Sequence, residues 1–283
     1  MRVAAGARNR RNVFIERRAA REGDTRAPAD VVFFDCRIRD FDSLADTFGH
    51  DPEMLGRWVR CVMTALIGPV EAAGGIVGTL VPGGFSAFFP APQSMEGACR
   101  AALDLMEATD RLNLTSEPQV SVSLGIAAGI GVEGDFGTEE RPLWTAIGLG
   151  SQIASALARS AARYGVTALA GPVTAEAVES HFALLQVDWL RLLDGSTTPL
   201  YALLAPPLTR GHPKFLALRA FHTHILDACQ ARDWQQAREK IAMARALSGA
   251  NTVLCDLYLE RIASYELYPP PEDWPGVIFE VQI

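Results

Sequence analysis

The apolar residues of this 283-residue chain follow two different patterns in two consecutive stretches. Between residues 31 and 204, short apolar runs typical of buried strands alternate with segments whose apolar residues recur at helical spacing. Beyond the proline-punctuated residues 205–213, the pattern is purely helical. The sequence therefore predicts an α+β domain over 31–204, a Pro-rich linker over 205–213 and a helical tail over 214–283, with a basic leader over 1–30.

The elements of the α+β domain are predicted from these patterns and from the turn residues between them. Strands are expected at 31–36, 76–81, 85–89, 119–130, 183–193 and 200–204, and helices at 52–73, 95–112, 150–164 and 172–180. Gly83 and Gly84 predict a hairpin turn, because glycine tolerates positive φ, and the glycines from Gly129 to Gly137 predict a second turn region. This order predicts helices on one face of a mainly antiparallel sheet.

The tail is expected to form three helices, at 214–231, 234–247 and 252–267. Trp234, with apolar residues following it at helical spacing, resembles one tetratricopeptide-type hairpin, to which the third helix is added. A single repeat cannot bury its own apolar face, so the tail is expected to dock on the first domain or on a partner protein.

Charge and cysteine usage exclude several classes of protein. The net charge is -7, and the leader carries eight arginines against four carboxylates, so the body is strongly acidic and no nucleic-acid partner is expected. The five cysteines are scattered without a C-x-x-C pair, as in a cytoplasmic protein with reduced thiols. No apolar stretch approaches the roughly 20 residues of a membrane span, so none is expected.

Two further motifs are interpreted without a functional role. His222 and His224 lie two residues apart on a predicted helix, which points them to different sides and excludes a shared metal ion; both are expected at or near the surface. The G-x-G-x-x-G spacing that begins at Gly129 lacks the strand–turn–helix context of a dinucleotide site.

Several short segments appear in an order known from one enzyme family. These are Ile38-Arg39 with Phe41, the Gly74-Gly75 turn, the segment 87–92, the glycines from Gly125 onward, and Trp144-Thr145-Ala146-Ile147-Gly148. Over residues 31–203 the chain resembles the class III adenylate and guanylate cyclase catalytic domains. Its helical tail, ending in Pro-Pro-x-Asp-Trp-x-Gly, is similar to the tail of certain bacterial adenylate cyclases. The resemblance implies a ferredoxin-like sandwich that pairs head to tail, with active sites between the partners.

The resemblance also implies two aspartates that hold two Mg²⁺ ions, and this chain departs from them. Arg37 stands at the first position and Gly83 at the second. Asp35, two residues before Arg37 on the same strand face, is the fallback ligand. Mg²⁺ requires hard oxygen ligands, so neither metal nor any other cofactor is expected. Mg²⁺ or Mn²⁺ would be needed only by an active cyclase.

The other functional positions of the family also differ. The base-selecting lysine and aspartate correspond to Thr79 and Leu149, and the asparagine and arginine that position the ribose and stabilise the transition state correspond to Gln152 and Ala156. The lysine that contacts the triphosphate falls near Asp194. Loss of one such charge-assisted contact costs on the order of 10²–10³ in rate.

The sequence therefore favours an inactive cyclase homologue that acts in the cytoplasm through dimerisation, with itself or with an active cyclase. Its tail would offer a second protein-docking surface. Two alternatives stay open: an atypical active cyclase that uses Asp35 with Glu133 or Asp135 to convert ATP or GTP, and a sensor that binds another ligand in the vacated cleft.

Overall fold

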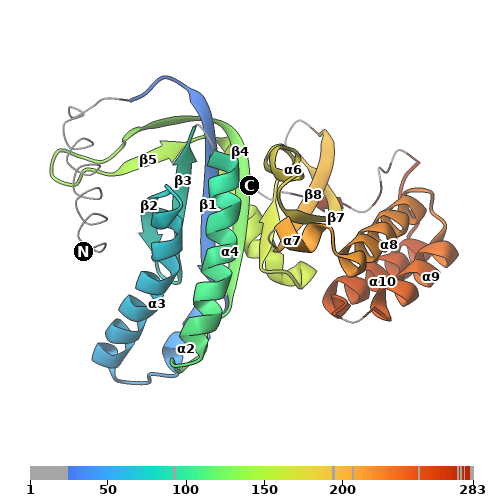
Figure 1. Ribbon diagram of the computed structural model, residues 1–283, viewed down its shortest axis with the longest axis horizontal. Helices are drawn as coiled ribbons and strands as arrows, with labels where there is room; N and C mark the ends of the chain where they lie inside the picture. Colours follow the sequence, from blue (N-terminus) through green and yellow to red (C-terminus); the bar gives the residue numbers. More distant parts are fainter. Residues whose placement is uncertain are drawn as a thin grey trace.

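The computed structural model describes residues 25–280 except 92–93, 193–194, 206, 248, 273, 275 and 277. Most of the predicted leader, up to residue 24, lies outside the described residues. The described chain forms one extended sheet with helices on both faces, followed by three tail helices (Figure 1).

The sheet has the strand order β2-β3-β1-β4-β6-β8-β7-β9, and β5 pairs only with β4. The strands are β1 (Ala29–Ile38), β2 (Ile76–Val81), β3 (Gly84–Pro90), β4 (Val122–Asp135), β5 (Trp144–Ile147), β6 (Ala168–Ala170), β7 (Ala183–Arg191), β8 (Thr197–Ala205) and β9 (Ile278–Glu280). Among the described strands, only the β4–β6 and β7–β9 pairs are parallel. The predicted α+β class with a mainly antiparallel sheet is confirmed.

Most helices begin close to the predicted positions, and two short ones, the first and the sixth of those given next, were not predicted. They are α2 (Phe41–Asp46), α3 (Pro52–Ala72), α4 (Ser94–Asn113), α5 (Leu149–Ser160), α6 (Pro172–Val178), α7 (Pro207–Arg210), α8 (Pro213–Gln230), α9 (Trp234–Arg245) and α10 (Thr252–Leu267). The side chains of Asp51, Asp233 and Asn251 accept backbone N–H groups at the starts of α3, α9 and α10. Such caps satisfy donors that the helix itself leaves free.

The central strand β1 is buried on both faces. Val32, Phe34 and Cys36 pack against α3 and α4, whereas Val31 and Phe33 pack on the opposite face, beside α5. The prediction of helices on one face only is therefore wrong. A strand buried on both faces has a continuous run of apolar residues. This run does not show whether helices or other elements cover each face.

The glycines from Gly129 to Gly134 lie within β4 and not in the predicted turn region. A Cβ on Gly131 would lie 2.8 Å from Phe33 Cζ, so this glycine leaves room for the ring. Past Gly131, β4 leaves its pairing with β1 and pairs with β5. The two strands form an arm, residues 132–147, seen at the upper left of Figure 1.

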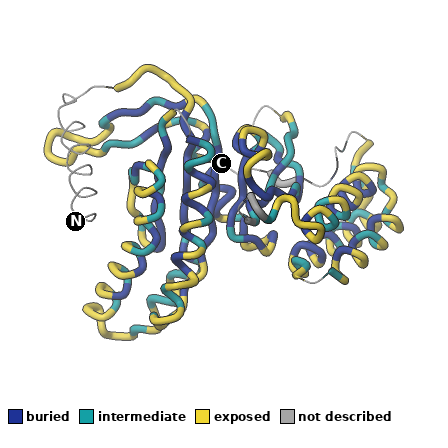
Figure 2. The backbone as a smooth tube through the Cα atoms, viewed as in Figure 1, coloured by how far each residue is buried: buried dark blue, intermediate teal, exposed yellow. Residues whose placement is uncertain are grey.

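The tail helices share a hydrophobic core with the far end of the sheet. Buried side chains of α8, α9 and α10 join those of β7 and β8 in one cluster, which includes Ile225, Ile241, Leu254, Val187 and Leu200. Figure 1 shows these helices at the opposite end of the molecule from the arm, and Figure 2 shows their buried sides facing the sheet. The short helix α7 lies within the segment predicted as a linker.

His222 in α8 is buried, contrary to its expected place at the surface. Its side chain is 1% exposed, and neither ring nitrogen has a hydrogen-bond partner. The ring lies 5.9 Å from that of Tyr258 in α10. Burial lowers the pKa of His222 from 6.5 to about 4, because a buried imidazolium without a partner loses its hydration.

This histidine makes stability dependent on pH. The folded pKa lies below the unfolded one, so the unfolded chain binds more protons between the two values. The contribution is complete above about pH 6.5 and is lost as pH falls toward 4, by up to about 3 kcal/mol. We expect His222→Phe to remove this component, which urea unfolding at a series of pH values would measure. His224→Phe, at an exposed position in the same helix, is the control. Parallel stability curves for wild type and His222→Phe would contradict the assignment.

Candidate functional site

The candidate site lies on the face of the sheet that α5 covers, where Asp35 and Arg37 form an ion pair. Arg37 Nε lies 2.6 Å from Asp35 Oδ1, and Arg37 Nη2 lies 3.2 Å from Asp35 Oδ2. Both oxygens of this carboxylate, which is only 4% exposed as a residue, thus accept from one guanidinium. The hydrogen bond with Asp35 raises the pKa of Arg37 above its usual value. The geometry is the bidentate pairing that arginine makes with carboxylates.

Gly83 occupies the turn between β2 and β3 with φ of +73°. A Cβ at this position would lie 2.7 Å from both Cβ and Cγ of Phe41. The carbonyl of Gly83 accepts the backbone N–H of Ile38, which fixes the turn against the end of β1. An aspartate at this position would be strained by its φ and would collide with Phe41.

Four other predicted positions lie in β2 and α5. Thr79 is exposed, and its Cα lies opposite that of Ser86, which in turn lies opposite Asp35. Leu149 is the first residue of α5 and is 48% exposed. In the same helix Gln152 is exposed, whereas Ala156 is only 4% exposed.

Asp194 lies outside the described residues, so its position relative to the site is not assigned.

The carboxylates that the active-cyclase alternative would combine with Asp35 are far from it. Asp35 pairs with Gly125, and Glu133 lies eight residues farther along β4, a distance of about 26 Å in a strand. Glu133 accepts hydrogen bonds from Arg26 and from the Trp144 indole, each at 3.0 Å. Asp135 accepts two backbone N–H groups within the arm. Within one chain these side chains stabilise the arm and cannot share a ligand with Asp35.

The free space beside Asp35 is small. A pocket of about 30 Å³ is bounded by Asp35, Ser86, Thr145, Ser151 and the neighbouring apolar side chains. This is room for about one water molecule. A nucleotide would need several hundred Å³, which this chain alone does not enclose here.

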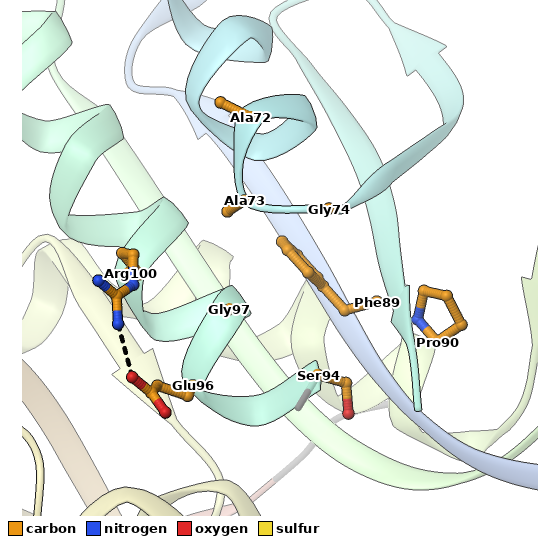
Figure 3. A pocket seen from close by; sticks show the side chains of 9 residues that line it. All are labelled: Ala72, Ala73, Gly74, Phe89, Pro90, Ser94, Glu96, Gly97 and Arg100. Carbon is orange, nitrogen blue, oxygen red and sulfur yellow. Dashed lines mark hydrogen bonds and ion pairs between the residues drawn. The ribbon is translucent and has the colours of Figure 1, made fainter. Parts of the chain in front are cut away.

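A larger cavity of about 380 Å³ lies at the end of α3, beside β3 and the first turns of α4 (Figure 3). Its lining is mostly Ala, Gly, Phe89 and Pro90, and the cation among the described lining residues, Arg100, is paired with Glu96 at 2.5 Å. This cavity is on the α3 and α4 side of the sheet, separate from Asp35. Because Glu96 neutralises Arg100, the described lining of the cavity has no unpaired charge with which to bind a charged ligand.

The sequence interpretation missed three polar side chains at the site. Ser155 of α5 accepts from Arg37 Nη2 at 3.2 Å and from Arg159 Nη1 at 2.7 Å. Arg39, just beyond β1, donates to Ser123 Oγ and to the carbonyl of Val166, both at 2.7 Å. The four-residue spacing of Ser155 and Arg159 on a helix was the available signal.

Within the described part of the chain, no group of three or more His, Cys, Asp or Glu side chains could hold a metal ion. The described helices also include none with the length and apolar character needed to cross a bilayer.

No protein-family model and no curated protein matches this chain. Solved structures do. A bacterial light-regulated adenylyl cyclase matches with TM-score 0.54 and 15% identity, over 63% of this chain and 91% of that one. The adenylyl cyclase CyaB from P. aeruginosa matches with TM-score 0.53 and 17% identity, over 64% and 96%.

The dimeric guanylyl cyclase domain of the RhoGC fusion protein from the aquatic fungus Blastocladiella emersonii matches with TM-score 0.55 and 14% identity, over 64% of this chain and 99% of that one. In each case nearly the whole neighbouring chain is matched by about two thirds of this one. The protein therefore has the fold of adenylyl and guanylyl cyclase catalytic domains, as predicted, with additional helices.

Proposed function

We propose that the protein is a nucleotide cyclase homologue without cyclase activity, which acts in intracellular signalling by pairing with another cyclase-fold domain. The Asp35–Arg37 ion pair carries this proposal. A guanidinium already neutralises Asp35, the fallback metal ligand on β1.

The residues present do not fit a two-metal site. A divalent cation would have to displace Arg37 from both Asp35 oxygens, and Gly83 supplies no second carboxylate. Thr79, Leu149 and Ala156 lack the charged groups that the resemblance implies for base and phosphate contacts, and Gln152 holds its amide on a longer side chain than the implied asparagine. The proposal therefore includes no cofactor, and Mg²⁺ or Mn²⁺ belongs to the active-cyclase alternative.

Exposed apolar side chains support an interface at the base of the arm. Ile130 in β4, Ile147 in β5 and Leu149 in α5 are 64%, 53% and 48% exposed. Large apolar side chains grouped on a surface mark sites of association. The partner is a second copy or an active cyclase, arranged head to tail. The tetratricopeptide-like tail, with Leu216 and Met243 exposed, would bind a further protein.

We expect no cyclic AMP or cyclic GMP from ATP or GTP with either Mg²⁺ or Mn²⁺, because metal and transition-state ligands are missing. Mass spectrometry of the reaction products, with an active cyclase assayed in parallel, is the measurement. Product that disappears in Asp35→Asn would overturn the proposal and support the active-cyclase alternative.

The same purified protein should associate as a dimer in sedimentation velocity, and Ile147→Glu should shift it toward monomer. Met243→Glu, an equally exposed apolar position on the tail, is the matched control. A wild-type protein that stays monomeric alone, and with an active cyclase, would refute the pairing.

A further inference from the structure

Two guanidinium groups meet at one hydroxyl group on the sheet face beside α5. Arg37 and Arg159 both donate to Ser155 Oγ, at 3.2 and 2.7 Å. Their donor nitrogens therefore lie within about 6 Å of each other. Two cations held this close repel unless negative charge lies between or beside them.

The local carboxylates do not balance this charge. Asp35 is engaged by Arg37, and among the described residues Arg159 has no carboxylate partner. Arg39, on the strand end two residues after Arg37, is half-buried and bonds only the neutral oxygens of Ser123 and Val166. Burial lowers the pKa of Arg39 despite the opposing field of Asp40. Three arginines thus face two carboxylates, the paired Asp35 and the exposed Asp40, which leaves a net excess of one positive charge.

The side chains of Arg37 and Arg159 are also accessible to solvent, and the hydroxyl group of Ser155 can donate a further hydrogen bond. The Arg37 side chain is 35% exposed, and Arg159 is exposed. Gly84 lies opposite Arg37 in β3, so no side chain covers the guanidinium from that strand. Ser155 accepts from both arginines, and within the described chain its own proton has no acceptor.

We infer that Arg37, Ser155 and Arg159 form a binding site for a phosphate-type anion that needs no metal ion, with Arg39 adding positive potential beside it. Guanidinium groups match the geometry of phosphate oxygens, and an anion offsets the excess positive charge. The ligand is inorganic phosphate, pyrophosphate or the phosphate group of a larger molecule.

This inference rests on one part of the proposed function, namely that Arg37 and not a metal ion neutralises Asp35. It does not require dimerisation or the absence of turnover. Cyclic nucleotide formation would refute the proposed function, whereas the anion site is tested by binding alone.

The test is isothermal titration of the full chain with pyrophosphate in EDTA, at low chloride concentration. We expect saturable binding that Arg159→Gln weakens by about tenfold, the loss of one charge-assisted contact. Ser155→Ala should weaken binding by a smaller factor. Circular dichroism and the thermal midpoint of each variant establish that it is folded.

The matched control is Arg57→Gln, which removes one positive charge from the exposed Arg57–Glu53 pair on α3. It should bind pyrophosphate like the wild type. Absence of saturable binding, an equal effect of Arg57→Gln and Arg159→Gln, or binding that appears only with Mg²⁺ would each overturn the inference.

A non-hydrolysable ATP analogue, titrated in the same EDTA buffer, identifies the source of the phosphate. Equal affinity for the analogue and pyrophosphate would support a site that recognises phosphate alone. Tighter binding of the analogue, still weakened by Arg159→Gln, would support a nucleotide bound through the same site.

Discussion

Arg261→Met is expected to lower the free energy of unfolding by about 3–5 kcal/mol, because it leaves a buried carboxylate without its cation. Asp188 in β7 is 0% exposed, and Arg261 Nη1 of α10 lies 2.7 Å from its Oδ2. The Tyr164 hydroxyl donates to the same oxygen. This cluster is a buried polar contact between the tail and the sheet, and urea unfolding followed by tryptophan fluorescence measures its loss.

The loss of stability caused by Arg261→Met should become smaller as pH falls. Burial raises the pKa of Asp188, and without Arg261 to oppose it that pKa rises further. A carboxyl with a raised folded pKa takes up a proton on folding, so lowering the pH stabilises the folded variant. Asp188→Asn combined with Arg261→Met should recover most of the stability for the same reason.

The control is Arg245→Met, which breaks the exposed Arg245–Asp256 pair in the same tail. Exposed pairs contribute about 0–1 kcal/mol, so this variant should unfold nearly like the wild type. A small effect of Arg261→Met at neutral pH, close to that of Arg245→Met, would show that the buried pair is unimportant for docking the tail.

Gly125→Ala is expected to destabilise the chain by about 3 kcal/mol or more, because the new Cβ overlaps backbone atoms. The Cβ would lie 1.9 Å from the Ala154 carbonyl oxygen and 2.6 Å from the Ala158 nitrogen, both in α5. Backbone cannot rotate away as a side chain can, so α5 must move off the sheet. Chemical denaturation measures the cost, and displacement of Ser155 should also weaken pyrophosphate binding.

Gly129→Ala is the matched control for this overlap. Gly129 lies four residues along the same strand, and the nearest atom to its Cβ would be the Gly150 nitrogen at 4.0 Å. This variant should change stability by less than about 0.5 kcal/mol, or increase it slightly by restricting the unfolded chain. Similar effects of the two substitutions would contradict close α5 packing as the cause.

Most elements of the fold were predictable from local patterns. Apolar spacing and turn residues placed β1, α3, the β2–β3 hairpin and the three tail helices near their observed positions. The strand β5, the helix α2 and the β9 pairing were not predicted, since short segments carry too little periodicity to stand out. The glycines of β4 were wrongly predicted to form a turn region. Glycine is needed where another group packs closely against a strand, as well as in turns.

The site divides in the same way. The sequence by itself determined which ionisable groups lie along β1. Because side chains alternate along a strand, it placed Asp35 and Arg37 on the same face, but it did not decide which of the two occupies the metal position. Only the tertiary structure decided it. It closed the two side chains into one ion pair and brought Ser155, 118 residues along the chain, against Arg37, with Arg159 bonded to the same hydroxyl. The physical reason is that burial and charge depend on side chains that packing brings together, and residues far apart in sequence meet only when the helix and sheet are assembled.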